Sequence, residues 1–185
     1  MWSSKSTLWL SWAINAVLSF LFIVLGGHSF GNVQDFRNAD WLDGNDDNTK
    51  RVRLSLFGVL AALFLSIVVL LVYNIFTFLV ILGRWISAKL MGGFGHGVIL
   101  TASIYTAAFM LLTALILHSQ DDTMKWGLKD KAEKNAYKGA FAFAYILVGT
   151  YTIMFAAFIM CRTAFREAPE EKPNPNPNPN FSASV

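Results

Sequence analysis

Four long apolar runs, separated by polar segments, set the pattern of this chain: residues 8–27, 54–82, 98–117 and 139–161. None of them contains Asp, Glu, Lys or Arg. A helix rises about 1.5 Å per residue, so about 20 residues cross the roughly 30 Å hydrocarbon layer of a bilayer. Backbone amides in lipid must bond within their own segment, which favours helices. The pattern therefore predicts an all-α fold, an integral membrane four-helix bundle with four transmembrane spans.

The polar segments between the runs predict three loops. The second, residues 83–97, is rich in glycine, and we expect a flexible turn there. The third, residues 118–138, has apolar residues at spacing four from Met124 to Ala136, with lysines between them. This spacing predicts an amphipathic helix that either lies on the membrane surface or extends the fourth span, and Ser119–Asp122 is suited to its start.

The predicted organisation is one transmembrane bundle over residues 1–165, followed by a tail over residues 166–185. All five prolines lie in this tail, and four of them alternate with asparagine from Pro173 to Asn180. Proline fixes φ and removes a backbone donor, so we expect the tail to be extended and disordered. Ser182 and Val185, at its end, are candidates for recognition by strand addition in a peptide-binding groove.

Composition narrows the classes of function. The chain has 185 residues, is 55% hydrophobic and carries a net charge of +3, with no run of five basic residues. We therefore expect no nucleic-acid partner. Cys161 is the only cysteine, so no intramolecular disulfide can form. It ends the fourth run beside Arg162, where it is either a palmitoylation site or an unmodified buried thiol.

The charges also bear on orientation. Four spans place both termini on one side of the membrane. The first and third loops hold nine Lys and Arg residues, against six in the termini and the second loop, and the positive-inside rule would place the nine in the cytosol. Small eukaryotic four-span proteins usually have cytosolic termini, however, and by that analogy we expect both termini in the cytosol.

A few polar residues interrupt the apolar runs. They are uncharged and are candidates either for interhelical hydrogen bonds or for the lining of a pore: Asn15, Asn74, Thr101, Ser103 and Thr106. An ionised residue inside a span is the usual mark of a proton relay or an ion path, and none is present. This absence argues against a proton-coupled transporter or pump.

Cofactor and catalytic chemistry have little support in the sequence. His28 and His118 end the first and third runs on the same side, and they are the only pair suited to a bis-histidine haem. No cluster of Cys and carboxylates adds to them to form a zinc site. No paired carboxylates or Ser-His-acid set can be justified at one membrane face. We expect no cofactor, no metal and no enzymatic activity.

The layout, with short polar ends, two moderate loops on one side and a tight connection between spans two and three, resembles MARVEL-type and other small tetraspan proteins. The resemblance covers spans and topology only.

We expect a non-enzymatic protein that organises membrane in trafficking or junctions, or an accessory subunit of a larger membrane complex. Its partners would be the lipid bilayer and other membrane proteins or further copies of itself. The alternatives are a small oligomeric channel or carrier with a polar, uncharged pore and, third, a haem-binding membrane protein.

Overall fold

The structure is a computed structural model that describes residues 4–39, 42, 46–86 and 92–160. It consists of five helices, listed in chain order: α1 (Ser4–Arg37), α2 (Asp47–Ile86), α3 (Gly92–Ser119), α4 (Asp121–Gly127) and α5 (Lys131–Met160). The described part of the chain contains no strand. All helices except α4 are long and apolar enough to cross a membrane, which confirms the prediction of four such helices and fits a multi-pass membrane protein. The tail over residues 166–185 lies outside the described residues.

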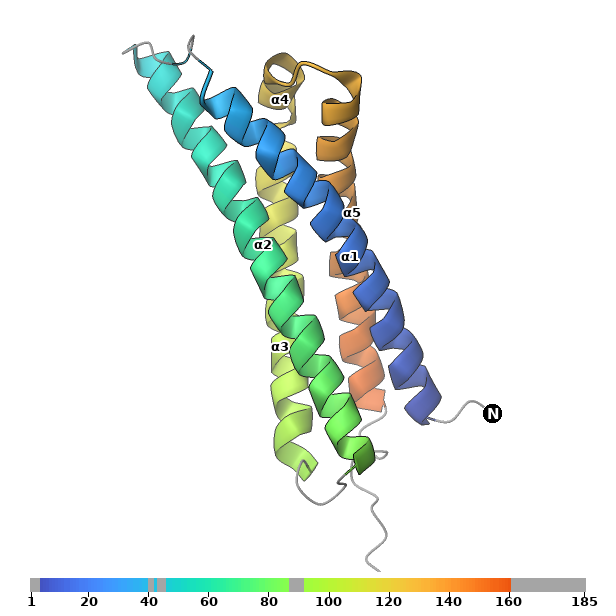
Figure 1. The fold of residues 1–185 in the computed structure, drawn as a ribbon. Coiled ribbons are helices and arrows are strands. Elements are labelled where there is room, and N and C mark those ends of the chain that lie inside the picture. Colours follow the sequence, from blue (N-terminus) through green and yellow to red (C-terminus); the bar gives the residue numbers. More distant parts are fainter. Residues whose placement is uncertain (1–3, 40–41, 43–45, 87–91, 161–185) are drawn as a thin grey trace, which may run out of the picture.

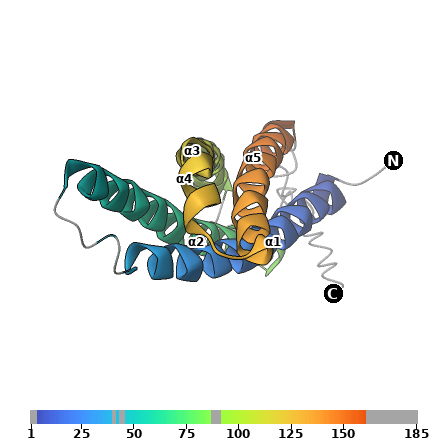
Figure 2. The same ribbon diagram turned by 90° about the horizontal axis from the view of Figure 1, so that it is seen from above.

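The four long helices run alternately up and down and form a ring in the order α1, α2, α3, α5 (Figure 1). Each packs mainly on its two neighbours in this ring, and the α2–α3 contact is the least extensive of the four. The first described residues of α1 and the end of α5 lie at the same end of the bundle. The short helix α4 lies at the opposite end, where the start of α2 splays away from α3 and α5 (Figure 2).

The helices are longer than the apolar runs that predict them. α1 continues to Arg37 and α2 begins at Asp47, so much of the expected first loop is helical. Likewise, α3 begins at Gly92, and the expected turn over the glycine-rich segment is wrong for residues 92–97. Neither segment contains proline, and a helix that leaves the apolar layer can continue as long as its polar side chains are solvated.

The predicted amphipathic helix of the third loop is divided in two. α4 begins at Asp121 as expected but ends at Gly127, and Leu128 is extended. Glu133 then accepts hydrogen bonds from the backbone amides of Lys129 and Asp130, at 2.9 and 3.4 Å, and so caps the start of α5. Met124 and Leu128 are nevertheless buried, so the apolar face of the prediction does turn inward.

The buried residues of all four long helices follow one heptad pattern, in which steps of three and four alternate. In α5 these inward positions are Tyr137, Ala140, Ala144, Leu147, Tyr151, Met154 and Phe158. The same alternation holds from Leu56 to Val80 in α2, from Ile99 to Leu117 in α3 and from Asn15 to Phe36 in α1. A strict seven-residue repeat keeps one seam of each helix toward its partners, as in left-handed four-helix bundles.

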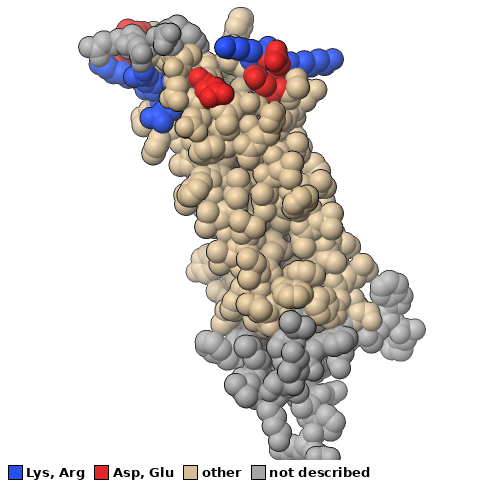
Figure 3. Space-filling view, viewed as in Figure 1, with Lys and Arg blue, Asp and Glu red and all other residues tan. Residues whose placement is uncertain are grey.

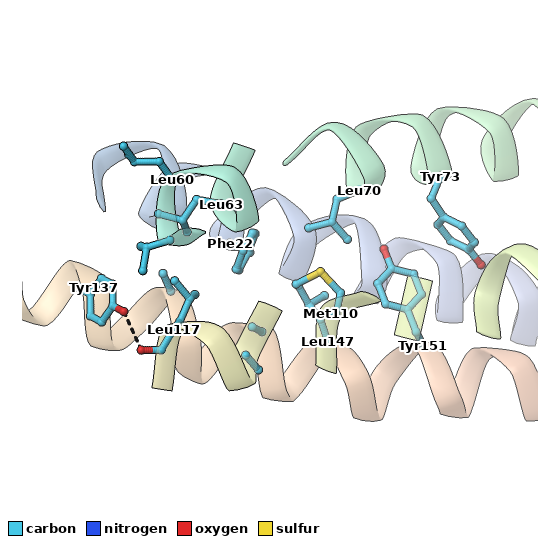
Figure 4. Close-up of a cluster of buried hydrophobic side chains, with 14 of the residues drawn as sticks. Phe22, Leu60, Leu63, Leu70, Tyr73, Met110, Leu117, Tyr137, Leu147 and Tyr151 are labelled. Carbon is cyan, nitrogen blue, oxygen red and sulfur yellow. Dashed lines mark hydrogen bonds between the residues drawn. The ribbon is translucent and has the colours of Figure 1, made fainter. Parts of the chain in front are cut away.

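The core along these seams is a continuous set of side chains from the four long helices. Figure 4 shows Phe22, Leu63 and Leu117 meeting in one part of the interior and Tyr73 and Tyr151 in another. Tyr137 in α5 donates a hydrogen bond of 2.6 Å to the carbonyl of Leu117, near the end of α3. The same carbonyl also accepts a hydrogen bond of 3.3 Å from the backbone amide of Gln120, so two donors satisfy it at the end of α3.

Candidate functional site

Polar side chains from the four long helices meet at one level inside the bundle, and we call this group the tyrosine cluster. Its members are Asn15 and Ser19 of α1, Tyr73 and Asn74 of α2, Ser103 of α3, and Tyr151 and Met154 of α5. All of them except the half-buried Asn74 are buried. The cluster is the candidate functional site because buried polar groups in an apolar surrounding are costly unless they bond one another.

The hydroxyl of Tyr151 joins three helices. It accepts a hydrogen bond of 3.2 Å from the Asn74 amide, which leaves its own proton available for Ser19 Oγ at 3.0 Å. Asn74 also donates to the carbonyl of Leu70, one turn earlier in α2, at 2.8 Å. Tyr151 therefore connects α5 to α1 beside it and to α2 across the ring.

The hydroxyl of Tyr73 joins α2 to α3. It lies 2.6 Å from Ser103 Oγ, and Ser103 donates in turn to the carbonyl of Ile99 at 2.8 Å. The Tyr73 hydroxyl is also 3.7 Å from the sulfur of Met154. The rings of Tyr73 and Tyr151 pack edge to face, with centroids 4.9 Å apart, so aromatic carbon fills the space between the two hydroxyl groups.

Asn15 completes the cluster from α1. Its amide nitrogen donates to the carbonyl of Ser11 at 3.0 Å and to the Met154 sulfur at 3.3 Å. Its amide oxygen has no partner among the described residues, although the residue is only 2% exposed. The amide oxygen of Asn74 and the hydroxyl of Thr77 are in the same situation. These atoms give the site acceptors that bond no other described residue.

A second polar contact lies further toward the α4 end. Ser66 of α2 and Thr113 of α3 are buried, and their hydroxyl oxygens are 2.7 Å apart. Ser66 also bonds the carbonyl of Ala62 at 2.7 Å, and Thr113 bonds that of Phe109 at 3.0 Å. Each hydroxyl has a single proton, so one of the two donates to its own helix while the other donates across and ties α2 to α3.

The polar residues that the sequence singles out lie on different faces of their helices. Asn15, Ser103 and Thr106 are buried, Asn74 is half-buried, and all four occur where the helices meet. Thr101 is exposed on the outward face of α3, two positions from Ser103 and therefore about 200° around the helix. Cys161, Ser182 and Val185 lie outside the described residues.

Sequence reasoning missed Ser19, Tyr73, Tyr151 and Met154. The apolar runs hid them, because tyrosine and methionine count as hydrophobic and isolated serines are common in spans. The heptad spacing was the available signal: Tyr151 lies seven residues after Ala144, and Tyr73 lies seven after Ser66. Ala144 and Ser66 are themselves small inward residues. Residues seven positions apart lie on the same seam, so this spacing would have shown that both tyrosines face inward.

A groove of about 560 Å³ lies between α2 and α3, the pair with the least extensive contact. It is open to the outside, and its walls are mainly the apolar side chains of Val72, Phe76 and Phe109. Tyr73 and Thr106 also line it. The groove therefore brings the outer surface of the bundle close to one edge of the tyrosine cluster.

Over residues 6–80 and 97–160, the charged residues gather at the α4 end of the bundle (Figure 3). Lys125 bridges Asp121 at 3.0 Å and Asp122 at 2.8 Å. The hydrogen bond and positive charge of Lys125 lower the pKa of Asp122, and the hydrogen bond to Asp122 raises the pKa of Lys125. Between the two ends, the described surface is apolar apart from scattered hydroxyls and tyrosines.

The residues proposed for haem lie at the surface. His28 and His118 are both exposed, and the His118 ring packs beside Phe141 and Tyr145 with centroids 5.6 and 6.2 Å away. Across the described ranges, no three His, Cys, Asp or Glu side chains come together as a metal site.

Comparisons of this chain with protein-family models, with curated proteins and with solved structures find no match.

Proposed function

We propose that this chain is a non-enzymatic, multi-pass membrane protein of the tetraspan type, which organises membrane or serves as an accessory subunit of a larger membrane complex. The observation that carries the proposal is that the polar side chains inside the bundle form hydrogen bonds with one another. Asn15, Tyr73 and Tyr151 bond within one chain, so the tyrosine cluster acts as interhelical glue. The chain's own fold uses these groups and leaves the outward surface for lipid and for other membrane helices.

The outward surface supports the same proposal. Large apolar side chains cover it on every long helix, including Phe20 at 64% exposed, Val72 at 62% and Ile153 at 67%. A water-soluble protein rarely exposes continuous apolar surface of this kind, whereas a bilayer or partner helices would cover it. The proposed partners are therefore the bilayer and other membrane proteins, or further copies of this chain.

The alternative is a small oligomeric channel or carrier with an uncharged polar path. One observation favours it, namely the unpartnered amide oxygens of Asn15 and Asn74 inside the bundle. A path through these atoms would have to pass the packed rings of Tyr73 and Tyr151.

Two measurements on the full chain separate the proposals. We expect purification in mild detergent to yield a complex of fixed stoichiometry, with other membrane proteins or with further copies, and liposomes containing the purified chain to show no solute or ion flux. Solute or ion flux that Asn74→Leu abolishes would support the channel instead. Thr101→Leu is the matched control, since it removes a polar group from the outward face of a span.

A further inference from the structure

The start of α5 carries three lysines on one face, which we call the lysine stripe: Lys131, Lys134 and Lys138. They are spaced three and four residues apart, so they lie within about 60° of one another around the helix. Lys131 and Lys138 are exposed and Lys134 is half-buried. None of the three forms an ion pair with any residue that the structure describes.

Three of the acids nearby are engaged elsewhere. Asp121 and Asp122 both bond Lys125. Glu133 points its carboxylate at the backbone amides of Lys129 and Asp130. The carboxylate of Asp130, directly before the stripe, is exposed and forms no ion pair with the stripe in the described part of the chain, so no counter-charge is in contact with the three lysines.

The position of the stripe is also unfavourable within the chain itself. The N-terminal end of a helix carries partial positive charge from the aligned peptide dipoles, so cations in its first turns are destabilising. Asp130 and Glu133 accompany Lys131 and Lys134 in the first turn of α5, but no acid accompanies Lys138 before the apolar stretch that begins at Gly139. A negatively charged partner would compensate the charge that these two acids leave.

The depth of the stripe indicates what that partner is. From Gly139 to Met160 the helix is free of charge, and its 22 residues extend about 33 Å, which matches the hydrocarbon layer. Lys138 directly precedes this stretch, so the stripe lies at the level of lipid headgroups. Trp126, in the adjacent helix α4, is 91% exposed, and tryptophan is enriched at the membrane–water boundary.

We propose that the lysine stripe binds the phosphate groups of anionic membrane lipids at the α4 end of the bundle. The inference rests on the proposed function, since it requires that the four long helices lie in a bilayer. Lysine is a compact point charge on a flexible stem, which suits contact with mobile headgroups more than a fixed bidentate site. Headgroup binding would fix the depth of α5 and select for a leaflet rich in anionic lipid.

The test uses the full chain in phosphatidylcholine vesicles with trace amounts of spin-labelled lipid. The measured quantity is the association of spin-labelled phosphatidylglycerol with the protein relative to spin-labelled phosphatidylcholine. We expect a preference of about fivefold for the anionic lipid, which falls toward one in 1 M NaCl. K131Q/K134Q/K138Q should abolish it, whereas K50Q/R51Q/K125Q, which removes the same charge at the same end of the bundle, should retain most of it.

Several outcomes would overturn the inference. One is equal association of both lipids with the wild-type chain, which would leave an acidic protein partner as the occupant. Another is an equal loss in the two triple variants, which would indicate a general charge effect. A third is loss of the preference when inorganic phosphate replaces chloride at equal ionic strength, because the ligand would then be a soluble anion. A chain that fails to enter vesicles would refute the proposed function, whereas a chain that enters them without lipid preference would refute this inference alone.

Discussion

The inward and outward faces of the four long helices are both mainly apolar, and they differ in that the inward face also holds buried polar side chains. Every buried Asn, Ser or Thr in the described helices occupies an inward heptad position, together with small residues such as Ala140 and Ala144. The outward face carries large apolar residues, of which Val72, Ile75 and Ile153 are each more than half exposed.

This difference identifies the forces that hold the bundle together. In lipid, apolar side chains gain little by leaving the solvent, so helices associate through close packing at small residues and through hydrogen bonds. The inward seam provides both, with alanines where α5 meets its neighbours and tyrosine hydroxyls that link α1, α2 and α3 to α5 or to each other. A variant on the inward face should therefore cost much more stability than the same change on the outward face.

The largest expected effect comes from enlarging a small inward residue. Ala144 is fully buried, so Ala144→Leu should lower the free energy of unfolding by about 3 kcal/mol through overpacking. Ala142, two positions away, is exposed on the same helix, and Ala142→Leu should change it by less than about 0.5 kcal/mol. Reversible unfolding in mixed micelles measures both, and equal losses would contradict the assignment of the faces.

The next effect concerns the α4 end of the bundle, where glycine permits close packing. A Cβ added at Gly127 would clash with the ring of Phe36, which is itself only 7% exposed. Gly127→Ala should thus lower stability by about 2 kcal/mol. Gly149→Ala is the control, because a Cβ there meets nothing within 4 Å and alanine favours a helix by roughly 0.5–1 kcal/mol. Thermal unfolding in detergent should show opposite signs, and a stabilised Gly127→Ala would disprove the packing of α1 on α4.

A smaller effect isolates the hydrogen bonds of the tyrosine cluster. Tyr151→Phe keeps the packed ring but removes the contacts with Ser19 and Asn74, so we expect a loss of about 1–2 kcal/mol. Tyr145→Phe, on the half-exposed side of α5, should cost almost nothing. Unfolding of the two variants under the same conditions provides the comparison. A neutral Tyr151→Phe would mean that ring packing alone holds the cluster.

The faces are only partly evident from sequence. The absence of charge over 20 or more residues predicts four helices, because crossing a bilayer requires that length and composition. It does not show which side of a helix faces inward, since both sides are apolar. A spacing of four residues would place Val148 on the same face as Ala140 and Ala144. In the structure, the inward seam instead continues through Leu147, which is fully buried.

The helix ends were harder to predict for a related reason. A polar segment marks the end of the membrane layer, but it ends a helix only where a cap or a breaker is present. α1 therefore continues ten residues past Gly27 to Arg37. The division between α4 and α5 had a readable signal in Gly127 and in the Asp130-x-x-Glu133 capping box.

The smallest expected effect lies outside the apolar layer, in the ion pairs of Lys125. The pKa of Asp122 is lowered, so its contribution to stability is present above its ordinary value of 3.8 and is lost as the pH falls through its folded value. The pKa of Lys125 is raised, so its contribution is present below 10.5 and is lost as the pH rises through its folded value. The melting temperatures of wild type and Lys125→Gln should differ slightly and constantly from pH 5 to 9 and converge at both extremes. Convergence inside that window would indicate that other groups control the pairs.

The most direct test of the central claim, that α5 turns its heptad seam from Ala140 to Phe158 toward its own bundle and its other face toward lipid, is a nitroxide scan from residue 139 to 158. Single cysteines would be introduced into a Cys161→Ser background and the chain reconstituted in vesicles. Accessibility to oxygen, which concentrates in the bilayer, should oscillate every 3.5 residues, with minima at positions 140, 144, 147, 151, 154 and 158. Uniform accessibility, or maxima at those positions, would contradict the account.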